Sequence, residues 1–486
     1  MSRGRTRPVG EGALALPPFG PASSPPRSIT TTKGLARFSG AILLAMVCSI
    51  AAIATPQNSS PNAKGGIIAD NEPTVYAITG AKIFTLAGAP IENGVVLIRD
   101  GKIAAAGAGV SVPADAKVID AKGLDVYPGF FDPVTQTGLT EISAVRATND
   151  ISELGDFNPD IVAMTAVNPE SAHIGVTRAS GITEVLATPG VRGFDTGGGA
   201  PTIAGQASLL NLAGWTSEQM TLRASTAMVF NWPSVESRNY DYETGSINER
   251  PYSEVKAEYD KKVYALGDLL DRARHYAQAV EKGSPQNFER DLKLEALIPV
   301  VEGKLPVLVV AQSARDIRNS VEFCGKQNLK MILAGGAEAW RVKDLLKQKN
   351  IPVILGPTMS LPNEEDYPYD KPMTQPSELT AAGIPIAFAS FDTSFSRRLS
   401  QQAGNAVAYG LSHDEALRAI TVNAAKMLGV DDQLGTIETG KLANIIVTDG
   451  DPLEIRTQVR YLFINGRQTS LENRHSDLYE KYRKRP

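Results

Sequence analysis

The chain has 486 residues, a length sufficient for two or three domains and a large buried core. Its composition, 42% hydrophobic and 21% charged, is typical of a globular protein that mixes helices and strands. Only four histidines are present, and they lie too far apart for an H-x-H, H-x-x-E-H or H-E-x-x-H metal motif. Two cysteines are too few for a zinc ribbon or a disulfide framework.

The first 54 residues predict a leader segment. Lys33 and Arg37 precede an apolar run over residues 41–54, which ends in Ala52-Ile53-Ala54. A basic region, a short apolar run and an A-x-A site are typical of a secretory signal peptide, and the run is short for a membrane span. A membrane anchor is the alternative. We therefore expect a leader and signal peptide over 1–54, a polar linker over 55–72, and an exported protein that is periplasmic or secreted.

The charge that remains after this segment argues against nucleic-acid binding. The whole chain has a formal net charge of −4, and residues 1–54 hold six basic residues and one acidic residue, which leaves −9 on the rest. An acidic chain without basic clusters is a poor partner for a polyanion. We expect no nucleic acid and no stable membrane span after processing.

Short β-rich segments occupy both ends of the mature chain. In residues 73–127, Asn93-Gly94 and Asp100-Gly101 separate strand-like runs, and such pairs are strong local signals for hairpins. Similar runs return over 436–470. We expect the two segments to form one small β-sandwich domain, followed by a charged tail over 471–486.

The centre of the chain, residues 128–435, alternates strand-like and helical patterns. The strand-like runs lie at 126–131, 182–188, 305–311, 330–335, 351–355 and 384–390. Because no G-x-G-x-x-G follows an early strand, this alternation favours a parallel barrel over a doubly wound sheet. The predicted fold class is α/β, a (β/α)₈ TIM-like barrel with the small β-sandwich domain. An insertion at about 225–300 carries a helix pattern, and a Gly-rich run at 197–206 predicts a flexible loop over the barrel mouth.

Two motifs resemble a known family. The segment that ends in Tyr127-Pro128-Gly129-Phe130-Phe131-Asp132, and the segment 416–444 with its Leu442-Ala443-Asn444, are similar to the amidohydrolase superfamily and to its imidazolonepropionase-like branch. The likeness covers about residues 75–468 and is weaker through 190–300. It implies a scaffold for metal-dependent hydrolysis of non-peptide C–N bonds, with the active site at the carboxyl ends of the barrel strands.

The same resemblance implies a divalent metal such as zinc, bound by four histidines and one aspartate. In this chain the histidine positions fall on Val134, Gln136, Val310 and Gly335, and only the aspartate is kept, as Asp392. Valine and glycine offer no side-chain ligand, and glutamine is a weak neutral one. We therefore predict no metal and no other cofactor. Asp392 is the candidate catalytic residue, as a general acid or base; the alternative is that it binds backbone at the strand end.

The remaining reactive side chains offer no replacement for that site. We expect His275, His413 and His475 at the surface, whereas His173 could lie near the pocket. Glu338 is expected as a charge at the start of a helix, beside the helix dipole, and not as a catalytic group. Cys324, which has no histidine near it in the sequence, is expected to be buried.

Three hypotheses about function follow, and whether the protein is an enzyme stays open among them. The first is an exported pseudoenzyme that binds a small-molecule ligand in the barrel mouth. The second is an active hydrolase of cyclic amides or acylated amino acids and dipeptides with unconventional ligands. The third is a structural partner of an active homologue, in a homo- or hetero-oligomer.

Overall fold

The computed structural model describes residues 75–191, 200–235, 238–241, 246–283 and 289–485. The predicted leader and linker lie outside these ranges. Among the helices that the structure describes, none is both long enough and apolar enough to cross a bilayer.

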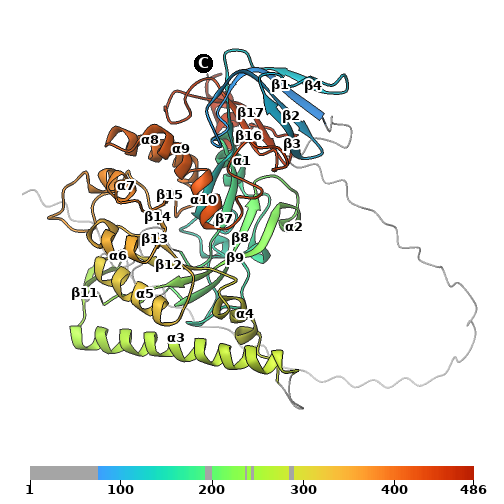
Figure 1. The fold of residues 1–486 in the computed structure, drawn as a ribbon. Helices are drawn as coiled ribbons and strands as arrows, with labels where there is room; N and C mark the ends of the chain where they lie inside the picture. Colours follow the sequence, from blue (N-terminus) through green and yellow to red (C-terminus); the bar gives the residue numbers. More distant parts are fainter. Residues whose placement is uncertain (1–74, 192–199, 236–237, 242–245, 284–288, 486) are drawn as a thin grey trace, which may run out of the picture. The chain divides into compact units, whose positions relative to one another are not determined.

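A β-rich domain is built from both ends of the described chain. Its strands are β1 (Val75–Ile83), β2 (Ile91–Arg99), β3 (Lys102–Gly107), β4 (Lys117–Asp120), β5 (Asp125–Pro128), β16 (Ile445–Thr448), β17 (Val459–Ile464) and β18 (Arg467–Gln468). They follow the order β18-β17-β16-β5-β1-β2-β3, with β4 paired to β1. The antiparallel pairing of β16 with β5 joins the two ends, and Figure 1 shows β16 and β17 beside the first strands. The domain has its own apolar core, which includes Tyr76, Ile98 and Phe463.

The second sheet is a TIM-like barrel, as predicted. Its strands are β6 (Phe130–Thr135), β7 (Ile182–Ala187), β8 (Ile203–Asn211), β9 (Thr221–Asn231), β12 (Val307–Ala311), β13 (Met331–Gly335), β14 (Val353–Leu355) and β15 (Ile386–Phe388). They are paired in chain order from β6 to β15. The Phe391 amide, just after β15, donates to the Val134 carbonyl on β6 at 2.9 Å, which brings the first and last strands together.

One strand departs from the parallel pattern. β8 pairs antiparallel with both β7 and β9, and the short helix α2 (Ser217–Met220) lies in the connection between β8 and β9. Residues 203–206 of the Gly-rich run are therefore strand and not loop, and residues 225–231 belong to the barrel and not to an insertion. The part of the run before residue 200 lies outside the described residues. Sequence reasoning missed β8 because this strand is rich in Gly, Ala and Ser instead of β-branched residues.

Helices cover the barrel and extend beyond it. They are α1 (Ala172–Ala179), α3 (Tyr252–Glu281), α4 (Leu292–Val301), α5 (Ala314–Lys326), α6 (Lys343–Gln348), α7 (Lys371–Ala381), α8 (Leu399–Ala408), α9 (His413–Ala419), α10 (Val422–Met427) and α11 (Arg474–Tyr482). Short 3₁₀ turns are η1 (Arg146–Thr148), η2 (Ala163–Ala166), η3 (Ala339–Val342) and η4 (Ser396–Arg398), and β10 (Arg238–Asp241) pairs with β11 (Ser246–Glu249). The long helix α3, expected from the pattern over 253–278, packs on α4 (Figure 1).

One helical pattern of the sequence is interrupted in the structure. Ser412 and Glu415 have the spacing of a capping box, which predicts one helix that runs to Gly429, but the helix breaks between α9 and α10. At the break, the Ile420 carbonyl accepts a hydrogen bond from the Phe131 amide on β6 at 2.8 Å, so a barrel strand takes an acceptor that a continuous helix would use. The predicted charged tail contains α11, which begins with a capping box formed by Asn473 and Ser476.

Candidate functional site

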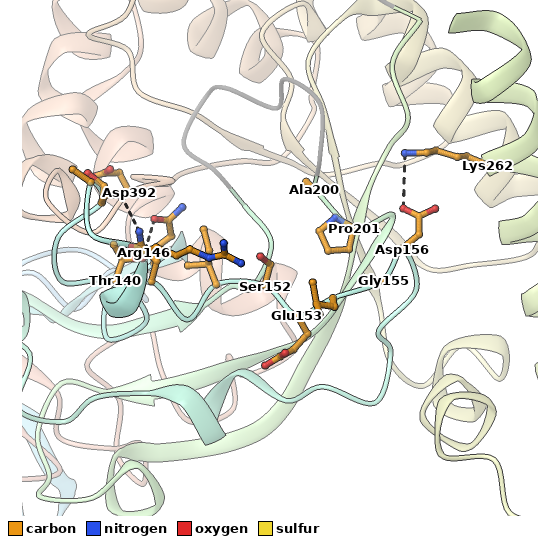
Figure 2. Close-up of a pocket in the computed structure, with 16 residues that line it drawn as sticks. Thr140, Arg146, Ser152, Glu153, Gly155, Asp156, Ala200, Pro201, Lys262 and Asp392 are labelled. Atoms are coloured by element: carbon orange, nitrogen blue, oxygen red, sulfur yellow. Dashed lines mark hydrogen bonds and ion pairs between the residues drawn. The ribbon is translucent and has the colours of Figure 1, made fainter. Parts of the chain in front are cut away.

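A pocket of about 1020 Å³ opens at the carboxyl ends of the first and last barrel strands. Its lining comes mainly from the segment after β6, from residues 140–156, and includes Gln136 and Asp392. Figure 2 shows Asp392 on one side and the Lys262–Asp156 ion pair, 3.9 Å between Nζ and Oδ1, on the other. The lining is polar and bears charges of both signs, so it suits a small polar ligand.

Asp392 lies in the pocket, but backbone groups hold its carboxylate. Oδ1 accepts from the amides of Ser394, at 2.6 Å, and Phe395, at 2.9 Å. The Asp392 carbonyl accepts from the hydroxyls of Ser390, at 2.7 Å, and Thr135, at 3.0 Å. The backbone-binding alternative is therefore observed, and the catalytic role stays a prediction.

Apolar side chains fill the barrel beneath this pocket. Val134 and Val310 are at most 2% exposed, and both belong to a cluster that also contains Val191, Phe391 and Ile332. Such a cluster excludes water, so ions and their hydration shells are unfavourable there.

Glutamine side chains occupy the space at the other two histidine positions of the superfamily, residues 136 and 335. Gln136 donates through Nε2 to the Val191 carbonyl, and its Oε1 lies 3.5 Å from the Thr140 hydroxyl. Gly335 has φ +92°, and a Cβ built there would lie 2.4 Å from Gln312 Nε2. The Gln312 amide therefore occupies the space that a side chain at residue 335 would need.

Known proteins similar to this chain agree with that architecture. Residues 381–472 match the amidohydrolase family. The chain is 22% identical to the amidohydrolase tasK of Hapsidospora irregularis over 77% of this chain but only 39% of tasK. It is 24% identical to the imidazolonepropionase of Caldanaerobacter subterraneus subsp. tengcongensis over 75% of this chain and 86% of that protein, and 26% identical to that of Symbiobacterium thermophilum over 77% and 91%. These matches support the amidohydrolase superfamily for this chain.

Solved structures support the same fold. An amidohydrolase from Thermotoga maritima superposes with a TM-score of 0.69 at 24% identity, covering 81% of this chain and 99% of that one. Molinate hydrolase gives a TM-score of 0.51 at 15% identity, covering 82% and 95%. The curated imidazolonepropionases match over about three quarters of this chain, which supports the imidazolonepropionase-like branch.

The residues present do not fit the divalent metal that the superfamily implies. Two of the four histidine positions lie in the apolar cluster, Gln136 is bound to backbone, and Gly335 has no side chain. Within the described ranges, no three His, Cys, Asp or Glu side chains are grouped so that they could hold a metal ion.

The four histidines of this chain lie elsewhere. His275 and His475 are exposed, and His413 Nε2 lies 2.7 Å from Asp451 Oδ2 at the surface. His173 is half-buried, its Nε2 lies 2.9 Å from the Glu141 carbonyl, and it is not among the lining residues of the pocket.

Glu338 directly precedes η3, so it lies at a helix start as expected, but its carboxylate interacts with the start of another helix. Glu338 is 4% exposed, and its Oε2 accepts from the Ala314 amide at 2.9 Å, so it caps α5 and not its own helix. Its other oxygen accepts from Asn363 Nδ2 at 3.0 Å. Cys324 is buried as expected, and burial raises the pKa of its thiol to about 12.

Asp132 is a polar residue of the barrel that sequence reasoning missed. It is fully buried, its Oδ1 accepts from the Ser390 amide at 3.0 Å, and its Oδ2 accepts from the Ser396 hydroxyl. Burial raises the pKa of this carboxyl to about 6. Its place at the end of the Pro-Gly-Phe-Phe-Asp motif was the available signal. Asp132 ties β6 to the segment after β15, and so it positions the loop that carries Asp392.

Proposed function

We propose that this chain is an exported amidohydrolase-like protein that binds a small molecule in the barrel mouth and lacks the metal centre of its superfamily. The observation that carries the proposal is the apolar cluster around Val134 and Val310, at the positions where the superfamily has histidines. Metal-dependent hydrolysis needs an ion that lowers the pKa of bound water. Nothing at these positions would hold that ion.

The pocket above the cluster supports a binding role. Its lining includes Gln136, Asp392, Arg146 and the Lys262–Asp156 pair. These groups can recognise amide, carboxylate or ammonium groups of a ligand without any change in bonding. The relatives named imidazolonepropionase suggest compounds with C–N bonds as the first ligands to test.

Metal analysis of the purified protein tests this proposal. We expect far less than one equivalent of metal per chain, both as purified and after incubation with zinc followed by desalting. We also expect no hydrolysis of cyclic amides or acylated dipeptides. The wild type, Asp392→Asn and the exposed control Asp366→Asn should therefore be indistinguishable in these assays.

Two results would contradict the proposal. Stoichiometric zinc with turnover that Asp392→Asn abolishes and Asp366→Asn keeps would favour an active hydrolase with unconventional ligands. Co-purification with a homologue that has its histidines, without ligand binding by the isolated chain, would favour the structural partner.

A further inference from the structure

A second pocket lies beside helix α1 and shares no lining residue with the mouth pocket. Its volume is about 400 Å³, within the range of small-ligand sites. It is formed by the start of α1, the segment that follows β8 and the start of α11.

Arg178 lines this pocket and has no acidic partner. It is 9% exposed, and its one hydrogen bond in the described structure runs from NH1 to the Leu212 carbonyl at 3.0 Å. Its Nε is buried without any partner, and no ion pair includes its guanidinium in the part of the chain that the structure describes. A buried charge without a counter-ion is costly, and an anion in the pocket would offset that cost.

Other groups around Arg178 favour negative charge as well. The N-terminal ends of α1, at Ala172, and α11, at Arg474, both line the pocket, and helix N-termini attract anions. The Trp215 indole also lines it, and its Nε1 is a buried donor with no partner. Glu170 is the one acidic residue in the lining, and its side chain is exposed.

We propose that this pocket, which we call the Arg178 pocket, binds the carboxylate of a small organic acid. The planar guanidinium can pair with both oxygens of a carboxylate, and the indole N–H can add a third hydrogen bond. The site is separate from the mouth pocket, because the two share no lining residue. It therefore does not depend on the proposed function.

Thermal unfolding of the full chain in acetate or succinate tests the Arg178 pocket. At equal ionic strength, we expect the wild type to show a saturable rise in Tm with either acid and no such rise with chloride. Arg178→Gln should weaken the apparent affinity by about tenfold or more, since it removes the charge and the fork of donors. Arg223→Gln is the matched control, because Arg223 also donates through NH1 to a carbonyl, that of Gly429, and lies outside the pocket. It should respond like the wild type.

Tryptophan fluorescence gives a second measurement in case Arg178→Gln does not fold. Trp215→Phe keeps the charge but removes the indole donor, and we expect it to lose the acid-dependent fluorescence change and to bind several-fold more weakly. Asp392→Asn should keep the full response, which separates this site from the mouth pocket. The proposal is wrong if the wild type shows no saturable effect of either acid, or if Arg178→Gln and Trp215→Phe both bind as the wild type does.

Discussion

Replacing Gly129 with alanine is expected to destabilise the protein by on the order of 3 kcal/mol, because a buried β-branched side chain already occupies the space of the new methyl group. A Cβ at residue 129 would lie 1.8 Å from Thr183 Oγ1 and 2.7 Å from Thr183 Cβ. Thr183 is fully buried on β7, so neither residue can move away cheaply. Gly129 itself is held by a hydrogen bond from its amide to the Asn444 carbonyl at 2.9 Å. The expected result is a much lower Tm or loss of soluble protein.

A matched substitution and a double variant separate this clash from a general effect of alanine. Gly88→Ala should be nearly neutral, because nothing lies within 4 Å of a Cβ there. Thr183→Ala removes the two atoms nearest to the new methyl group, so Gly129→Ala with Thr183→Ala should cost less than the sum of the two single changes. If Gly129→Ala is as stable as Gly88→Ala, then residue 129 does not lie as close to Thr183 as the structure places it.

The contacts of Gly129 and Asn444 explain why the two family-like motifs, near the two ends of the described chain, predict the architecture. Gly129 belongs to the first motif and Asn444 to the second, and they meet where the β-rich domain joins the barrel. Asn444 also donates through Nδ2 to Glu184 and to Asn211 Oδ1, and its Oδ1 accepts from the Asn465 amide at 2.6 Å. Because both Nδ2 and Oδ1 of Asn444 are hydrogen-bonded to buried or half-buried groups, another side chain at this position would leave some of those groups without a partner. The motifs therefore report a structural junction, and from them the architecture could be predicted.

The barrel interior could be predicted only in part. The replacements at Val134 and Val310 follow from the resemblance alone, whereas their packing into one apolar cluster depends on strands far apart in the sequence. Gln312 was missed because its amide reaches the space beside Gly335 through a turn after β12 that carries no local signal. Asp132 was missed because its partners, Ser390 and Ser396, lie more than 250 residues away.

The buried carboxyl at this same junction should make stability fall as pH rises. Glu184 is 2% exposed, and burial raises the pKa of its side chain from 4.5 to about 8, against opposing hydrogen bonds from Thr183 and Asn444. In the unfolded chain the group loses its proton near pH 4.5, whereas the folded protein keeps it up to about pH 8. The stabilisation is therefore complete below pH 4.5 and is lost as pH rises toward 8, with an upper bound of about 5 kcal/mol.

Glu184→Gln should remove this dependence. Glutamine has the same shape and cannot ionise; its Oε1 can still accept from Asn444, and its amide can donate to the Thr183 hydroxyl. We expect the Tm of the variant to match that of the wild type near pH 4.5 and to exceed it by several degrees at pH 8. Asp132 titrates in the same direction, between its usual value and about 6, but it is present in both proteins and cancels in the difference. Glu365→Gln, at an exposed site, should follow the wild type at every pH. A variant less stable than the wild type at pH 8 would show that Glu184 is stabilising in its ionised form, through Thr183 and Asn444, and would overturn this assignment.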